Sequence, residues 1–127
     1  MGLAAGGALG REREIPRIVD NGFTTPYLQQ PIKFGASLVV HSATKFLDGQ
    51  GRVLGGLIAG SSKLIAEARF FARHTGPAMS PFNAWVLSKS LETLAVRMDR
   101  HCSNALALAR HFEGHPELES VRYPGLP

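Results

Sequence analysis

The stretch Val39-Val40-His41-Ser42-Ala43-Thr44-Lys45 decides the fold of this chain, because an apolar run ends there in two hydroxyls and one lysine. A second apolar run, Ile18-Val19, ends in the carboxylate of Asp20. Short runs rich in valine and isoleucine are typical of buried strands. The sequence therefore predicts two buried strands, each followed by side chains that can take part in chemistry.

A short helix is predicted between these strands. It covers Pro26–Phe34, with Thr25 as its N-cap and Pro26 at the first helical position. Gly35 is expected to end it, because glycine readily adopts the left-handed backbone that follows many helices. Strand, helix and strand within about 25 residues approach the length of a compact βαβ unit.

Such a unit brings the two polar strand ends together. Parallel strands have their carboxyl ends at the same edge of a sheet, where open α/β folds bind ligands. We therefore expect Asp20 and the Ser42–Lys45 turn to form one site.

The residue types of this expected site point to pyridoxal phosphate as the cofactor. Lys45 would form a Schiff base with it and, as the catalytic residue, move protons at the substrate carbons. Asp20 would keep the pyridinium nitrogen protonated, and Ser42 and Thr44 would donate hydrogen bonds to the phosphate. The alternative is an ordinary surface turn at Ser42–Lys45, since Ser-x-Thr-Lys is common in such turns.

Longer motifs resemble the Cys/Met-metabolism family of pyridoxal phosphate enzymes. The resemblance covers residues 18–127 and rests on the segments Val19–Pro31, His41–Phe46, Gly76–Trp85, Leu91–Met98 and Tyr123–Pro127. It implies an α/β fold of the aspartate-aminotransferase type, fold type I. The expected part of that fold is a parallel-rich sheet with flanking helices and a long C-terminal helix.

The same resemblance divides the chain into three parts. Residues 1–17 do not resemble the family and are expected to be a disordered N-terminal stretch. Residues 18–116 would be a part of the large domain that binds pyridoxal phosphate. Residues 117–127 would start the connection to a C-terminal domain, with a strand that begins at Val121.

The segment after the lysine, Asp48–Gly56, resembles the O-succinylhomoserine sulfhydrylases of this family. That resemblance implies a γ-replacement in methionine biosynthesis, in which succinate leaves O-succinylhomoserine, sulfide enters and homocysteine forms. Cystathionine γ-synthase and O-acetylhomoserine sulfhydrylase are the alternatives within the family. An alternative of another class is a remnant without turnover that binds only cofactor or subunits.

Apolar periodicity predicts the remaining scaffold. A third strand is expected at Gly56–Gly60, followed by a serine-capped helix over residues 61–73. A further helix is expected to begin with Ser80 and Pro81, and its apolar stripe runs from Ala84 to Phe112 at steps of three and four. If continuous, it forms one helix of about 50 Å that ends before Gly114.

Composition fits a cytoplasmic enzyme that acts on a small amino-acid substrate. The chain has 127 residues, 44% of them hydrophobic, and a net charge of +4 that is spread along the sequence. Scattered charge disfavours nucleic-acid binding, and no run reaches the roughly 18 apolar residues of a membrane span. The single cysteine, Cys102, allows no internal disulfide, and no histidine has metal-ligand spacing. The family resemblance implies a homo-oligomer, typically a tetramer.

Overall fold

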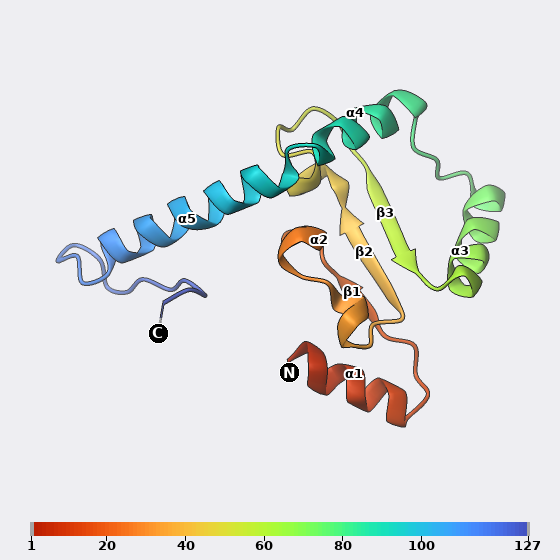
Figure 1. Ribbon diagram of the computed structural model, residues 1–127, viewed down its shortest axis with the longest axis horizontal. Helices are drawn as coiled ribbons and strands as arrows, with labels where there is room; N and C mark the ends of the chain where they lie inside the picture. The colour runs from red at the N-terminus through yellow and green to blue at the C-terminus, as the bar shows by residue number, and fades with distance from the viewer. Residues whose placement is uncertain (1, 127) are drawn as a thin grey trace. The chain divides into compact units, whose positions relative to one another are not determined.

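The computed structural model describes residues 2–126. The chain divides into two compact units, Met1–Leu94 and Ala95–Pro127. The first unit contains a small sheet with short helices around it, and the second is built on one long helix (Figure 1). The domain boundaries expected at residues 17 and 116 stay predictions.

Three strands form one sheet in the order β1-β2-β3. β1 (Ile18–Asp20) and β2 (Leu38–Ser42) run parallel, as predicted, whereas β3 (Gly56–Gly60) lies antiparallel to β2. The sheet is therefore mixed, where the sequence analysis expects a parallel-rich one. The physical reason is the connection from β2 to β3, which contains one short turn and no crossover helix, so that the chain folds back on itself.

The connection between β1 and β2 contains two helical turns instead of the single predicted helix. These are α2 (Thr25–Leu28) and η1 (Pro31–Phe34). Gln30 stands before a proline and leaves the helical region, with φ −121° and ψ 79°, because the proline ring crowds the preceding residue. Gly35 ends η1 with a φ of 85°, as predicted.

The N-terminal residues form a helix where the sequence analysis expects disorder. α1 covers Leu3–Glu12, and its Gly7 is buried against the carbonyl of Phe34. The Arg17 guanidinium donates a hydrogen bond to the Leu3 carbonyl. These tertiary contacts compensate for a glycine-rich sequence whose own helix propensity is weak.

Serine caps begin the next two helices, as predicted. α3 (Ser62–Thr75) follows Ser61, and α4 (Pro81–Leu91) follows Ser80. Each serine Oγ accepts a hydrogen bond from a backbone N–H three residues further on, at 3.4 Å in α3 and 3.1 Å in α4. Such bonds satisfy N–H groups that the first turn of a helix leaves without partners.

The core of the first unit lies between β2, the turn η2 (Ala43–Leu47) and α4. Its buried apolar side chains include Ala36, Val39, Ala43, Leu47, Val86 and Leu87. Removing apolar surface from water is the main source of stability in such a core. The turn that follows β2 is therefore anchored at both ends, by Ala43 and by Leu47.

The long helix predicted from Pro81 to Phe112 is interrupted, and α5 (Leu94–Phe112) begins as a separate helix. The backbone N–H groups of Glu92 and Thr93 bond to carbonyls three residues back, at 3.3 and 3.4 Å, as in a 3-10 turn. The Thr93 hydroxyl also donates to the carbonyl of Ser90. Threonine can bond to nearby backbone in this way and so end a helix that its apolar periodicity would continue.

After α5, the described residues form turns up to Leu126, and the strand expected at Val121 is not formed. Gly114 follows the helix with a φ of 76°, as predicted. None of the helices between residues 2 and 126 is both long enough and apolar enough to cross a membrane. Over the same residues, no group of three or more acidic, histidine or cysteine side chains is placed to hold a metal ion.

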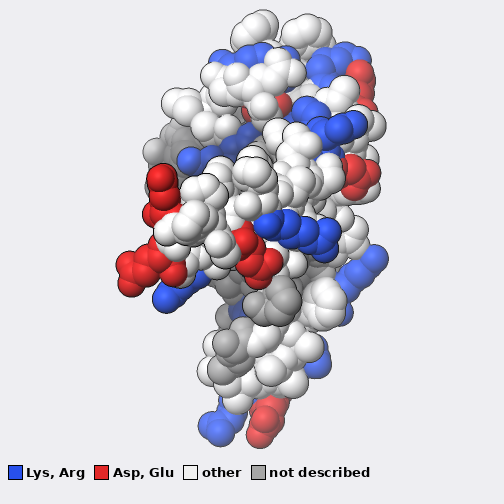
Figure 2. Space-filling view, turned by 90° about the vertical axis from the view of Figure 1, so that its left-hand side faces the viewer, with Lys and Arg blue, Asp and Glu red and all other residues white. Residues whose placement is uncertain are grey.

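Charged side chains of both signs are interspersed on the face of the chain that Figure 2 shows. Lysine and arginine lie next to aspartate and glutamate there, rather than in one basic patch.

Candidate active site

Asp20 is the last residue of β1 and pairs in register with Val40 of β2. Side chains alternate between the two faces along a strand, so Asp20, Val40 and Ser42 share one face of the sheet. The Asp20 carboxylate is exposed and accepts a hydrogen bond from the Gly22 N–H at 2.9 Å. A predicted acid and a predicted hydroxyl thus lie on the same face and at the same edge.

Gly22 lies closely between these two residues. A Cβ added to Gly22 would stand 3.1 Å from Asp20 Oδ1 and 3.3 Å from Ser42 Cβ. Asp20 and Ser42 therefore border the same small space, which exists because Gly22 has no side chain.

Asn21 holds the backbone of this segment in place. It is 2% exposed, and its N–H donates to the Val40 carbonyl at 2.8 Å. Its side-chain Nδ2 donates to the carbonyls of Thr25 and Gln29, at 3.0 and 2.9 Å. Thr24, rather than the predicted Thr25, precedes α2 as its N-cap, and its hydroxyl donates to Asn21 Oδ1. A fully bonded buried amide of this kind fixes the chain as it leaves β1.

Lys45 sits at a kink in η2, where its φ of −81° and ψ of −130° leave the helical region. The side chain is exposed, and its Nζ lies 5.5 Å from the centre of the Phe23 ring. Such a distance allows a cation–π attraction. Because Phe23 directly follows Gly22, this contact brings the amine to the segment that leaves Asp20.

Thr44 forms hydrogen bonds with Gly55, the residue that precedes β3. The Gly55 N–H donates to Thr44 Oγ1 at 3.1 Å, and the Thr44 hydroxyl donates back to the Gly55 carbonyl at 3.3 Å. The Thr44 N–H donates to the same carbonyl at 3.2 Å. Thr44 is therefore held firmly beside Lys45, and its hydroxyl proton forms the longest of these three bonds.

His41 points to the other face of the sheet, together with Val39. It is 5% exposed, and its Nδ1 is buried without a hydrogen-bond partner within reach among residues 2–126. Burial lowers the pKa of His41 below its ordinary value, although the backbone of Asn21 and the charge of Asp20 act in the opposite direction. The His41 ring is thus a neutral group of the core and does not belong to the site at the carboxyl ends of β1 and β2.

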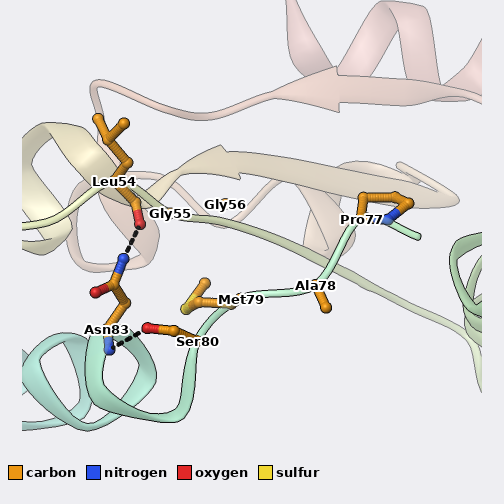
Figure 3. Close-up of a pocket in the computed structure, with 8 residues that line it drawn as sticks. All are labelled: Leu54, Gly55, Gly56, Pro77, Ala78, Met79, Ser80 and Asn83. Atoms are coloured by element: carbon orange, nitrogen blue, oxygen red, sulfur yellow. Dashed lines mark hydrogen bonds between the residues drawn. The ribbon is translucent and has the colours of Figure 1, made fainter.

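A pocket of about 510 Å³ lies beyond Gly55, between the chain that enters β3 and the chain that enters α4 (Figure 3). Its lining consists of Leu54, Gly55, Gly56, Pro77, Ala78, Met79, Ser80 and Asn83. The Asn83 Nδ2 donates to the Leu54 carbonyl at 3.0 Å and joins the two segments. Because Gly55 also bonds to Thr44, the pocket adjoins the predicted phosphate hydroxyl.

The structure adds residues that the sequence analysis does not single out as part of the site. Asn21, Gly22 and Phe23 all follow Asp20 directly, and each shapes the space or the contacts around it. Their only signal in the sequence is that they occupy the turn immediately after a strand that ends in an acid.

The amino-acid sequence matches the family model described as Cys/Met metabolism PLP-dependent enzyme over residues 3–127. This match includes most of the first 17 residues, which the sequence analysis leaves outside the resemblance. The chain is 55% identical over 109 residues to O-succinylhomoserine sulfhydrylase of Pseudomonas aeruginosa, and the matched region covers 86% of this chain and 27% of that protein. It is 44% identical over 111 residues to L-methionine gamma-lyase of Treponema denticola, with coverage of 86% and 28%.

A solved structure confirms the fold. Cystathionine gamma-lyase from Lactobacillus plantarum, crystallised with L-serine, superposes with a TM-score of 0.93 at 32% identity and covers 98% of this chain. The chain spans 33% of that protein, and 27% and 28% of the two relatives above. The family match extends over nearly all residues, and the solved cystathionine gamma-lyase shares the fold. The chain therefore belongs to the Cys/Met-metabolism family of pyridoxal-phosphate-dependent enzymes.

Proposed function

We propose that this chain carries cofactor-binding and catalytic groups of an enzyme that converts O-succinylhomoserine and sulfide into homocysteine and succinate. The observation that carries the proposal is the arrangement of Asp20, Ser42 and Lys45 around the segment that leaves β1. The 55% identity to a relative named O-succinylhomoserine sulfhydrylase supports the choice of substrate.

The residues at this edge fit a pyridine ring that bears a phosphate. The exposed Asp20 carboxylate, held by Gly22, is able to accept a hydrogen bond from a protonated ring nitrogen. The missing Cβ of Gly22 leaves room in front of Asp20 and Ser42. The Gly55 N–H fixes the Thr44 oxygen, so that the hydroxyl proton is able to turn from the Gly55 carbonyl toward a phosphate oxygen.

Each side chain then has a defined task. Bound pyridoxal phosphate supplies an electron sink for the charge that develops on the substrate. Lys45 holds the cofactor through its amine and later takes and returns protons at the substrate carbons. Asp20 keeps the ring nitrogen protonated, which maintains that sink. Phe23 attracts the protonated form of the Lys45 amine through its ring face.

A second candidate function is a lyase reaction, because L-methionine gamma-lyase of Treponema denticola is 44% identical to this chain. Proton transfer by a lysine serves both reactions, so the edge of the sheet by itself does not separate them. A substrate panel separates the two reactions. It compares the succinyl and acetyl esters of homoserine, each supplied with sulfide or cysteine, with methionine alone. Homocysteine that forms only from the succinyl ester and sulfide supports the proposed reaction.

The proposal includes a cytoplasmic location and assembly with further copies of the same subunit. Cys102, the single cysteine, lies half-buried in α5 and suits a reducing compartment. Sedimentation of the purified chain measures its assembly, and a monomer at every concentration contradicts that part.

The first test is the site of covalent cofactor attachment. Purified chain is mixed with pyridoxal phosphate, reduced with borohydride, digested and mapped by mass spectrometry. We expect the adduct to form mainly on Lys45, because the neighbouring Asp20, Ser42 and Thr44 hold the rest of the cofactor. The Lys45→Ala variant should lose this adduct, while Lys33→Ala should keep it. Equal labelling of all lysines would contradict the proposal.

A further inference from the structure

Asp48 is a completely buried carboxylate that follows the lysine turn. Its side chain is 0% exposed, and the Arg52 backbone N–H donates to its Oδ2 at 2.7 Å. The Arg52 side chain reaches its Oδ1 with Nε at 3.0 Å and Nη2 at 2.9 Å. Burial alone would raise the pKa of Asp48, but the hydrogen bonds and charge of Arg52 outweigh it, so the pKa is lowered. The group is therefore a paired carboxylate inside the protein.

The same group is joined to α4 through Ser90. The Arg52 Nη2 donates to Ser90 Oγ at 2.6 Å, and Ser90 Oγ lies 3.3 Å from Asp48 Oδ1. Ser90 is 4% exposed and its hydroxyl donates to the Val86 carbonyl at 2.7 Å. A buried carboxylate whose oxygens are all engaged fixes its surroundings, because any movement breaks several charged hydrogen bonds at once.

Backbone bonds connect Asp48 to the turn that carries Lys45. The Asp48 N–H donates to the Ala43 carbonyl at 2.9 Å, and the Gly49 N–H donates to the Lys45 carbonyl at 2.8 Å. Between these two bonds lies the kink at Lys45, whose backbone is outside the helical region. The two hydrogen bonds therefore hold the backbone on either side of the kink.

We propose that Asp48 is a positioning residue for Lys45. Through Arg52 and Ser90 it fastens the turn to α4, and through its own backbone it holds the kink that directs the lysine amine. Asp48 and Arg52, which belong to the segment Asp48–Gly56 after the lysine, thus help to position the Lys45 amine. The positioning of Lys45 is argued from these contacts alone, and only the chemical role of its amine rests on the proposed function.

The competing account is that Asp48 contributes to stability and to nothing else. The two accounts differ in a measurable ratio, the labelling of Lys45 relative to Lys63. Both amines are exposed, but Lys63 lies on α3, away from the Asp48 contacts. General destabilisation changes both lysines, whereas loss of positioning changes Lys45 alone.

The experiment compares the wild-type chain with Asp48→Asn by the pyridoxal phosphate and borohydride mapping described above, while circular dichroism reports folding. We expect the Lys45 to Lys63 ratio to fall about tenfold to a hundredfold in the folded variant, as for other misplaced reacting groups. Glu113→Gln, which removes an exposed negative charge that follows α5, is the matched control and should keep the ratio. A folded Asp48→Asn variant with the wild-type ratio overturns the proposal, and so does an equal loss in Glu113→Gln.

Ser90→Ala decides the question if Asp48→Asn does not fold. It keeps the buried ion pair and removes the link to α4, so a folded Ser90→Ala chain should label Lys45 less selectively. An unchanged ratio in that chain overturns the proposal.

Amide hydrogen exchange separates this proposal from the proposed function. If the wild-type chain shows no preference for Lys45, the proposed function fails, and the Gly49 N–H then tests the positioning directly. It should exchange faster in Asp48→Asn or Ser90→Ala than in the wild-type chain, while amides of β2 keep their rates. Equal rates at Gly49 overturn the proposal.

Discussion

Gly22 controls how closely the acid and the hydroxyl of the site approach each other. The backbone N of Ser42 would stand 3.3 Å from an added Cβ, as close as the Ser42 Cβ itself. A backbone atom held in a β-ladder has little freedom to move aside, so a methyl group here must displace Asp20, Ser42 or both.

Gly22→Ala should therefore lower the free energy of unfolding by about 1 kcal/mol, since overpacking costs roughly 1–3 kcal/mol and the stiffer unfolded chain regains about 0.4–1 kcal/mol. It should also weaken cofactor retention. Urea denaturation and equilibrium dialysis measure the two effects. Gly56→Ala is the control, because its Cβ would meet only the His41 carbonyl, at an ordinary 3.5 Å. Equal losses in both variants would speak against a special role of Gly22.

At the scale of elements, caps and breaks decide where each helix lies. Ser80 begins α4, the helix that supplies Ser90 to the Asp48 contacts and Leu87 to the core. The Ser80 cap therefore supports the turn that carries Lys45 indirectly, through α4 and Ser90.

Ser80→Ala should lower the free energy of unfolding by about 1 kcal/mol, the usual cost of losing an N-cap hydroxyl. Ser88→Ala, an exposed position within the same helix, should change it little or raise it slightly, because alanine favours helix interiors. Chemical denaturation of both variants provides the comparison. A Ser80→Ala chain as stable as the wild type would show that Pro81 alone suffices to begin α4.

Helix interruptions show where sequence patterns reach their limit. The apolar stripe from Ala84 to Phe112 is present, yet the helix is interrupted where the Thr93 hydroxyl donates a hydrogen bond to the Ser90 carbonyl. Likewise Pro31 divides the predicted helix between β1 and β2 into α2 and η1. Periodicity records which face is apolar, whereas a break depends on a few local hydrogen bonds that periodicity does not contain.

At the scale of the whole molecule, two buried groups make stability depend on pH. The pKa of His41 is lowered in the folded chain, chiefly by burial. The unfolded chain therefore binds the proton more readily, and stability falls as pH drops below the ordinary histidine value of about 6.5. The pKa of Asp48 is lowered by Arg52 despite burial. Its contribution is present above the ordinary aspartate value of about 4 and is lost as pH falls below that value.

The melting temperature should thus be level near neutral pH, decline below about pH 6.5 and decline again below about pH 4. Calorimetry or circular dichroism across this range measures the profile. His41→Leu should remove the first decline, because no proton is then bound on unfolding, and replacement of the exposed His74 by glutamine should keep it. A first decline that persists in His41→Leu would assign it to another group.

The amino-acid sequence by itself determined the two parallel strands, the serine caps and the residues Asp20, Ser42, Thr44 and Lys45 as candidates. These follow from local chemistry: valine-rich runs, turn residues and functional groups that stand at strand ends. The order of the chain also required Asp20 and Ser42 to share an edge, because β1 and β2 are joined by a short crossover.

Only the tertiary structure decided what surrounds those candidates. The antiparallel return of β3, the contact of the N-terminal helix with Phe34 and the link from Asp48 and Arg52 to Ser90 all depend on how separate elements pack. Such contacts depend on distances that residue types and spacing do not encode, since each one requires several elements to pack in the correct geometry at once. Lys45 was recognised as a candidate from its neighbours in the sequence, whereas the contacts that surround it come from segments that only the folded chain brings together.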